Sequence, residues 1–252
     1  MKQLLLIISL ALPFFLSAQN VEGEIQYEQR VKFKIDLPEG QEHLLEKLPT
    51  AQTFEKILFL KGNESLYRDL EEGENTDETI ESTEEREEGT VRMKMVIARP
   101  QNKLYKNLEK GEIVDSRDFM GRKFLIEDKL KSYDWKLTGE QEEILGYSCQ
   151  KASFQKEDDT IEAWFTTQIP TPNGPDNYGQ LPGLILKVVS DNGDREIVAT
   201  SIKLEPIPED ASFVATKGKK ISQEEYDKIV AEKRKEMEEE GGGGFQIKIR
   251  QN

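Results

Sequence analysis

The most reactive side chains in this sequence are one cysteine, Cys149, and one histidine, His43. A nucleophilic cysteine needs a neighbouring base or a lowered pKa. His43 is the one imidazole available, and it lies between charged and polar residues in a context typical of a surface. We therefore interpret Cys149 as a small buried hydrophobic residue and not as half of a cysteine–histidine dyad.

The single histidine restricts other kinds of site as well. Zinc sites with two histidines cannot form within one chain, and a serine nucleophile would again depend on His43. The GxSxG, GxGxxG and GxxxxGK[ST] patterns are absent. The 49 Asp and Glu residues are so numerous that carboxylate pairs are neither favoured nor excluded. The sequence thus predicts no catalytic residue, no metal site and no cofactor.

Composition narrows the class of partner. The formal net charge is −14, which argues against binding to nucleic acid or to anionic lipid, because both reward basic patches. The lone cysteine allows no intramolecular disulfide, so stability must come from burial of a core.

The first 18 residues resemble a secretory signal peptide. Lys2 is followed by an apolar run from Leu4 to Leu16 and by the small residues Ser17 and Ala18. We expect cleavage near Ala18 and a soluble periplasmic product. No cysteine follows that could carry a lipid, and no later apolar run approaches the roughly 20 residues that span a membrane.

Hydrophobic alternation then dominates the chain. From Val21 to Ile35, apolar and polar residues alternate as in a strand with one buried face. Turn signals at Gly62-Asn63, Lys110-Gly111 and 191–194 predict hairpins. Further strands are predicted at 91–97, 133–137, 144–154 and 161–169. About ten strands predict a mostly β fold: a single curved antiparallel sheet, a half-barrel or open barrel like the lipoprotein carriers, with a C-terminal helix.

The predicted organisation is a signal peptide over 1–18, an antiparallel β domain over 19–216, and a C-terminal helix, glycine linker and short tail over 217–252. Residues 71–89 are so polar and acidic that they predict a flexible loop. They lack the calcium-binding D-x-[DN]-x-[DN]-G spacing.

The helix begins at a capping box. Ser222 is placed to cap it while Glu225 reaches back. Gly241 to Gly244 end it, and Phe245 opens an alternating tail like an edge strand.

A proline-rich stretch, 169–189, is the most distinctive part of the sequence. Prolines fix φ and remove donors, so this stretch cannot lie in a central ladder. Pro182-Gly183 matches the centre of a type II turn, with positive φ at the glycine. Leu184-Ile185-Leu186 predicts a strand covered on both sides.

This stretch carries a resemblance to a known family. Leu181-Pro182-Gly183-Leu184-Ile185 reproduces five of the six letters of the GLPGLI signature, and Gln180 stands where the first glycine would be. The chain resembles the GLPGLI family of exported bacterial proteins. The resemblance implies a Gram-negative envelope protein with no assigned activity and no known catalytic residue. We interpret the motif as a folding device.

Together these features predict a non-enzymatic periplasmic binding or interaction protein. The expected partners are an envelope protein, such as an outer-membrane partner, or an apolar ligand held on the concave sheet face. The alternative is a carboxylate- or metal-dependent hydrolase of the envelope, which a convergent cluster of buried carboxylates would favour.

Overall fold

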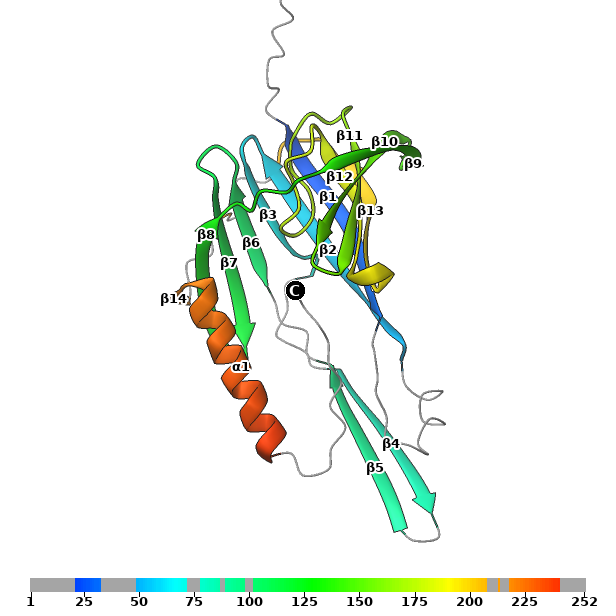
Figure 1. Cartoon of the computed structure of the whole chain (residues 1–252), viewed down its shortest axis with the longest axis vertical. Helices are drawn as coiled ribbons and strands as arrows, with labels where there is room; N and C mark the ends of the chain where they lie inside the picture. Colours follow the sequence, from blue (N-terminus) through cyan, green and yellow to red (C-terminus); the bar gives the residue numbers. More distant parts are fainter. Residues whose placement is uncertain are drawn as a thin grey trace, which may run out of the picture.

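The computed structural model describes residues 21–32, 49–71, 78–86, 89–97, 102–207, 213 and 218–240. The fold is mostly β, with a twelve-stranded sheet, a separate two-stranded sheet and one C-terminal helix (Figure 1). This confirms the predicted fold class. The expected signal peptide, His43 and the tail after 240 lie outside the described residues. None of the described helical structure is long and apolar enough to cross a membrane.

The large sheet is built from two meanders that meet at its centre. The strand order is β14-β8-β7-β6-β3-β2-β1-β13-β12-β11-β10-β9. The first meander comprises β1 (Glu22–Lys32), β2 (Ala51–Lys61), β3 (Glu64–Asp69), β6 (Lys103–Asn107), β7 (Glu112–Phe119) and β8 (Arg122–Lys129). The second comprises β9 (Lys136–Ile144), β10 (Tyr147–Lys156), β11 (Asp159–Thr166), β12 (Leu184–Ser190) and β13 (Arg195–Lys203). These strands pair antiparallel, and β14 (Lys219–Ile221) adds to β8 in parallel.

The connection from β8 to β9 requires the sheet to be strongly curved. These strands are ten positions apart in the order, which would separate them by about 48 Å in a flat sheet. Residues 130–135, which we call the crossover, join them and reach about 25 Å when fully extended. The edges must therefore curl toward each other, and Figure 1 shows the crossover running across the open side.

Register irregularities contribute to this curvature. The pairing shifts at Gln26/Tyr27 of β1, at Gln150/Ala152 of β10 and at Trp164/Phe165 of β11. Each such bulge bends its strand and increases the local twist.

The main core lies between the second meander, the central strands and the proline-rich residues 169–183. Its fully buried members include Ile25, Tyr27, Leu58, Phe165, Ile169, Leu184 and Ile185. The predicted strand covered on both faces is confirmed, because Leu184, Ile185 and Leu186 are all 0% exposed.

Several predicted elements differ from the structure. Within the acidic stretch expected as a loop, Glu78–Arg86 form β4, which pairs with β5 (Gly89–Ile97). Backbone pairing with a neighbouring strand supplies order that side-chain burial cannot supply there. Residues 133–135 lie in the crossover and not in a strand. The predicted strand 144–154 is interrupted by a turn at Leu145 and Gly146, which both have positive φ.

The helix α1 (Gln223–Glu240) docks on its own sheet beside β8 and β14 (Figure 1). The Ser222 Oγ accepts a hydrogen bond from the Glu225 main-chain N–H at 3.1 Å, which confirms the predicted cap. The Tyr226 ring packs against Phe124 with centroids 5.6 Å apart, and Ile229 extends the contact.

The turn between β12 and β13 is stabilised by Asp159, at the start of the neighbouring strand β11. Asp191, Asn192 and Gly193 all have positive φ. The Asp159 carboxylate accepts hydrogen bonds from the main-chain N–H groups of Asp191 and Asn192, each at 2.8 Å. Asp159 thus supports a backbone conformation that is unfavourable for non-glycine residues.

Candidate functional site

The proline-rich segment 169–183 crosses the concave side of the sheet as a chain of tight turns. The N–H groups of Thr171, Asn173 and Gly183 bond to the carbonyls two residues earlier, at 2.7–2.9 Å. A proline lies at the centre of each turn, and its fixed φ suits an inverse γ-turn. The segment is therefore a rigid platform whose carbonyls are aimed by its prolines.

The prediction of a type II turn at Pro182-Gly183 is wrong. The Gly183 N–H bonds to Leu181 O, and the Leu184 N–H bonds instead to Ile169 O at 3.0 Å. Gly183 does not have positive φ. A glycine is needed because a Cβ at this position would lie 2.1 Å from the Thr166 main-chain oxygen.

Lys106 of β6 connects the proline-rich segment to the sheet through hydrogen bonds. Its side chain is 1% exposed, and Nζ donates to the carbonyls of Gly174, Asp176 and Tyr178 at 2.8, 2.8 and 3.1 Å. Three acceptors match the three N–H donors of an ammonium group. Burial lowers the pKa of Lys106 to about 7, while the Asp176 charge opposes that shift.

Asp176 joins the segment to the other meander. Its Oδ2 lies 2.7 Å from the Arg195 guanidinium of β13, and the two side chains are 20% and 11% exposed. Burial raises the pKa of Asp176, but Arg195 and Lys106 outweigh it and hold the pKa below its usual value. Asp176 is therefore ionised at neutral pH.

Asp115 of β7 is a second buried carboxylate near this charge. Its Oδ2 accepts a hydrogen bond from Arg117 Nε at 2.7 Å and lies 2.7 Å from Arg117 Nη2 in an ion pair. Burial raises the pKa of Asp115, Arg117 opposes the shift and the Asp176 charge adds to it. The Arg117 guanidinium in turn lies over the Tyr226 ring of α1, 5.0 Å from its centroid.

A small cavity opens beside Asp115. Its volume is about 20 Å³, enough for one water molecule. Its lining residues are Ile113, Asp115, Arg117, Ile126, Asp128, Lys129, Lys131, Asn177 and Gln223. The crossover, the proline-rich segment and the start of α1 therefore each contribute a lining residue to this cavity: Lys131, Asn177 and Gln223.

The arrangement brings together two carboxylates with opposite pKa shifts. Such a pair is able to divide the roles of proton donor and charged partner in a hydrolytic reaction. Among the described residues, no group of Asp, Glu, His and Cys is arranged to hold a metal ion. The chemistry available at this site is acid–base chemistry at Asp115, in the field of Asp176.

Gln180, which replaces the first glycine of the motif, clamps the crossover. It has φ of 67°, a conformation that favours glycine. Its side-chain amide donates to Lys131 O at 2.5 Å and accepts from the Tyr133 N–H at 3.3 Å. The crossover is also held through Tyr133 Oη, which donates to Asn177 O at 3.1 Å.

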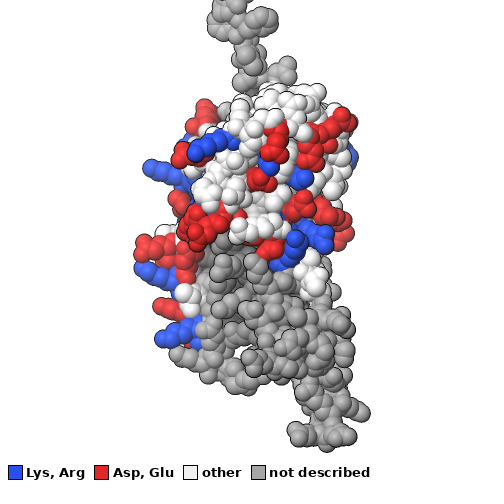
Figure 2. All heavy atoms as spheres, turned by 45° about the vertical axis from the view of Figure 1, so that its right-hand side comes forward, with Lys and Arg blue, Asp and Glu red and all other residues white. Residues whose placement is uncertain are grey.

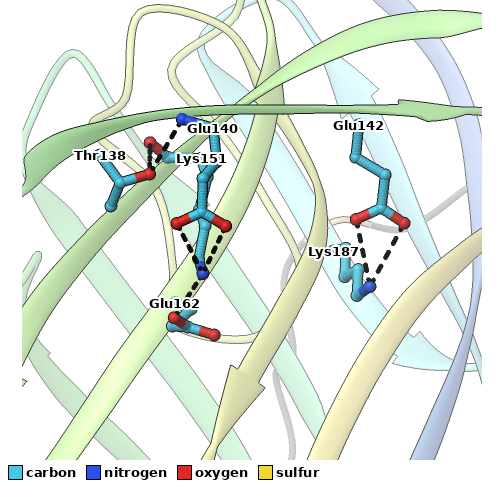
Figure 3. A network of polar contacts seen from close by, with 6 residues as sticks. All are labelled: Thr138, Glu140, Glu142, Lys151, Glu162 and Lys187. Atoms are coloured by element: carbon cyan, nitrogen blue, oxygen red, sulfur yellow. Dashed lines mark hydrogen bonds and ion pairs between the residues drawn. The ribbon is translucent and has the colours of Figure 1, made fainter.

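A second charged network covers the opposite face of the sheet (Figure 3). Lys151 pairs with Glu162 and Glu140 at 2.7 and 3.2 Å, and Lys187 pairs with Glu142 at 3.3 Å. Both ammonium groups lie over the Trp164 ring, 5.1 and 4.6 Å from its centroid. Acidic and basic side chains are likewise interspersed over the part of the surface that is coloured in Figure 2. Because lysines neutralise these carboxylates, we interpret the network as structural: it shields the Trp164 ring from solvent.

The structure tests the residue singled out for reactivity. Cys149 is 0% exposed, and burial, with a smaller contribution from Glu142, raises the pKa of its thiol to about 11. A thiol of this kind is a poor nucleophile, which confirms its interpretation as a buried hydrophobic residue. The five motif residues Leu181, Pro182, Gly183, Leu184 and Ile185 form the end of the segment and the start of β12.

The charged residues of this site, Lys106, Asp115, Asp176 and Arg195, were not identified from the sequence, although the alternation pattern in two strands indicated the first two. In β6, alternation places Lys106 on the same side as Leu104, and in β7 it places Asp115 on the same side as Ile113. A charged residue at an apolar position of an alternating strand indicates a buried, partnered charge. Neither strand pattern identifies Asp176 or Arg195 as the partners.

The comparisons with known proteins now assign a family. The model of the N-glycanase peptide, N-terminal domain, matches residues 75–229. The chain belongs to this family. A comparison with curated proteins gives no match. Among solved structures, "Structure of PNGF-II in P21 space group" and "Structure of PNGF-II in C2 space group" are similar. Each has a TM-score of 0.53 and 20% identity over 85% of this chain.

The PNGF-II likeness shows the fold alone. This chain spans about a third of those proteins, 34% and 33%. An uncharacterised conserved protein from Thermus thermophilus is less similar, with a TM-score of 0.41 and 8% identity over 82% of this chain and 93% of that one.

The family assignment corrects three expectations. The GLPGLI resemblance is wrong, because the matching model is that of an N-glycanase domain. The prediction of a non-enzymatic binding protein, and with it the prediction that the chain is no enzyme, is overturned by the same finding. The two functional predictions rested on the absence of a plausible nucleophile and base in the sequence. That absence does not argue against a hydrolase that uses carboxylates. The hydrolase alternative agrees better with the family.

Proposed function

We propose that this chain works in the hydrolytic release of asparagine-linked glycans, as the N-terminal domain of an N-glycanase. The observation that carries the proposal is the family match over residues 75–229, more than half of the chain. The PNGF-II structures support it through their fold. The substrate class is an N-glycosylated peptide, and the bond cleaved is the amide between the asparagine side chain and the first sugar.

Amide hydrolysis needs a proton for the departing amine and a group that positions or deprotonates water. Asp115 has a raised pKa and borders the water-sized cavity. Asp176 stays ionised beside Arg195. We assign proton transfer to Asp115, whose pKa is raised chiefly by burial, and we assign to Asp176 a negative charge that adds to this shift.

The test is incubation of the chain with an N-glycosylated peptide. Mass spectrometry would detect the free glycan and the conversion of the linkage asparagine to aspartate. Loss of a general acid costs about 10² to 10⁴ in rate, so Asp115→Asn should reduce release at least about a hundredfold. The matched control is Glu112→Gln, an exposed carboxylate on the same strand, which should release glycan at the unmodified rate.

Two results would contradict the proposal. One is the absence of glycan release by a chain whose circular dichroism spectrum shows a folded β protein. The other is an unchanged rate in Asp115→Asn, which would remove this carboxyl group from the reaction even if glycan is released.

The expected compartment belongs to the same proposal. Lys2, the apolar run from Leu4 to Leu16 and the Ser17-Ala18 pair support export and cleavage near Ala18. An exported location, in the periplasm, suits an enzyme whose substrates are glycoproteins or glycopeptides found outside the cytoplasm. Sequencing the N-terminus of the protein recovered from envelope fractions tests this, and a retained Met1 would contradict it.

A further inference from the structure

A larger cavity lies between α1 and the beginning of β8. Its volume is about 470 Å³, within the range typical of small-molecule sites. Its apolar lining is Phe124 of β8 and Ile229 of α1. The Tyr226 ring holds the first part of the helix against Phe124, and the cavity begins where Ile229 follows one turn later. None of its lining residues borders the Asp115 cavity.

The charges around this cavity are unusual for such an acidic chain. Two acidic side chains line it, Glu232 and Glu236, together with four basic ones: Arg122, Lys123, Lys219 and Lys233. The chain as a whole carries a formal net charge of −14. This is therefore a locally positive hollow that would concentrate anions.

Two of the four basic side chains, Lys219 and Lys233, form ion pairs, whereas Arg122 and Lys123 are available for a ligand. Lys219 pairs with Glu225 at 3.0 Å, and Lys233 pairs with Glu236. Arg122 and Lys123, by contrast, have no carboxylate within ion-pair distance among the residues the structure describes. Both residues line the cavity, and guanidinium and ammonium groups are each suited to carboxylate, phosphate or sulfate oxygens.

We propose that this cavity binds a small amphipathic anion, with its oxyanion head at Arg122 and Lys123 and its apolar body against Phe124 and Ile229. A neutral ligand would gain no ion pair from these two exposed cationic groups, and the excess of basic over acidic lining residues disfavours a cationic ligand. A purely inorganic anion would leave the apolar lining unused. The inference does not depend on the glycan-release proposal, because the two sites share no residue.

The fluorescent probe 8-anilinonaphthalene-1-sulfonate has this chemistry, with a sulfonate head and an aromatic body. Titrated into the full chain, it should bind and gain fluorescence. The double variant Arg122→Gln/Lys123→Gln should weaken its binding at least tenfold. The charge-matched control Lys136→Gln/Lys156→Gln removes two exposed lysines from β9 and β10 and should leave binding unchanged. A separate variant, Ile229→Trp, should fill the cavity and abolish binding.

Competition separates the two halves of the ligand. Octanoate should displace the probe, whereas octanamide, with the same chain and no charge, and inorganic phosphate, with charge and no chain, should displace it at least tenfold more weakly. Equal displacement by octanamide would overturn the ionic part of the proposal, and equal displacement by phosphate would overturn the apolar part. Unchanged probe affinity in the Arg122/Lys123 double variant, or in a folded Ile229→Trp variant, would overturn the site.

Discussion

The Lys106 ammonium nitrogen lies 2.8 Å from the main-chain oxygen of Asp176, whose own carboxylate pairs with Arg195 at 2.7 Å. Asp176 therefore connects β6 of the first meander to β13 of the second through both its backbone and its side chain. This linkage fixes the proline-rich segment over the concave side of the sheet and adds a negative charge to the surroundings of Asp115.

Replacing Lys106 with methionine should destabilise the fold. The substitution leaves three inward-facing carbonyls without their donor, and each such loss costs about 1 kcal/mol. We expect the free energy of unfolding, measured by urea denaturation, to fall by about 3 kcal/mol. Lys110→Met, at an exposed turn position next to β6, should change it by less than about 0.5 kcal/mol. Equal effects of the two substitutions would show that the contacts of Lys106 do not stabilise the segment.

The same lysine should give the stability a specific pH dependence. Burial lowers the pKa of Lys106 from 10.5 to about 7 in the folded chain. Between these values the unfolded chain holds a proton that the folded chain has released, so this group makes stability rise with pH. The difference in unfolding free energy between the unmodified chain and Lys106→Met should therefore increase from pH 7 to pH 9. A difference that stays flat or decreases would place the pKa of Lys106 near its ordinary value.

Gln180 allows backbone strain to be separated from side-chain contacts. Gln180→Ala removes the bonds to Lys131 and Tyr133 but keeps a residue with a Cβ at φ of 67°. Gln180→Gly removes the same bonds and also relieves the strain, which costs about 1–2 kcal/mol. We expect the alanine variant to be less stable than the glycine variant by about 1 kcal/mol in thermal or urea unfolding. The reverse order would mean that this backbone conformation carries no strain.

Gly183 should tolerate no side chain. A Cβ there would lie 2.1 Å from Thr166 O, and the backbone oxygen cannot move without breaking the connection from β11 to the segment. Gly183→Ala should therefore destabilise the fold by more than about 3 kcal/mol. Gly146→Ala is the matched comparison, because Gly146 has φ of 81° but open space around it, and it should cost only about 1 kcal/mol. Similar melting temperatures for the two variants would contradict the close contact at Gly183.

Local sequence patterns predicted the parts of the fold that depend on neighbouring residues. Period-two alternation located β1, and the turn signals at Gly62 and Gly111 are confirmed by positive φ at both glycines. The continuous run Leu184-Ile185-Leu186 correctly predicted burial on two faces. These features are set by side-chain direction and turn geometry, which a short window of sequence specifies.

Features that depend on distant residues were not predictable in this way. Tyr133 and Trp135 alternate like a strand, yet they lie in the crossover, where Trp135 Nε1 donates to Gly179 O at 3.0 Å. Pro182-Gly183 has the composition of a type II turn, but the approach of Thr166 decides its geometry. The candidate site was missed for the same reason, since Lys106 and Asp176 are 70 residues apart.

The two meanders also suggest how the molecule could be divided. Each is continuous in sequence, and within the large sheet they are joined along a single seam, the pairing of β1 with β13. A cut in the crossover after Ser132 would leave both meanders intact and sever only the covalent connection over the open side. The two halves, produced separately, should therefore recognise each other through that seam, through the Lys106 contacts with the proline-rich segment and through the docking of β14 and α1 on β8. The chain thus has the layout of a split protein whose fragments reassemble by completing two strand pairs, β1 with β13 and β8 with β14.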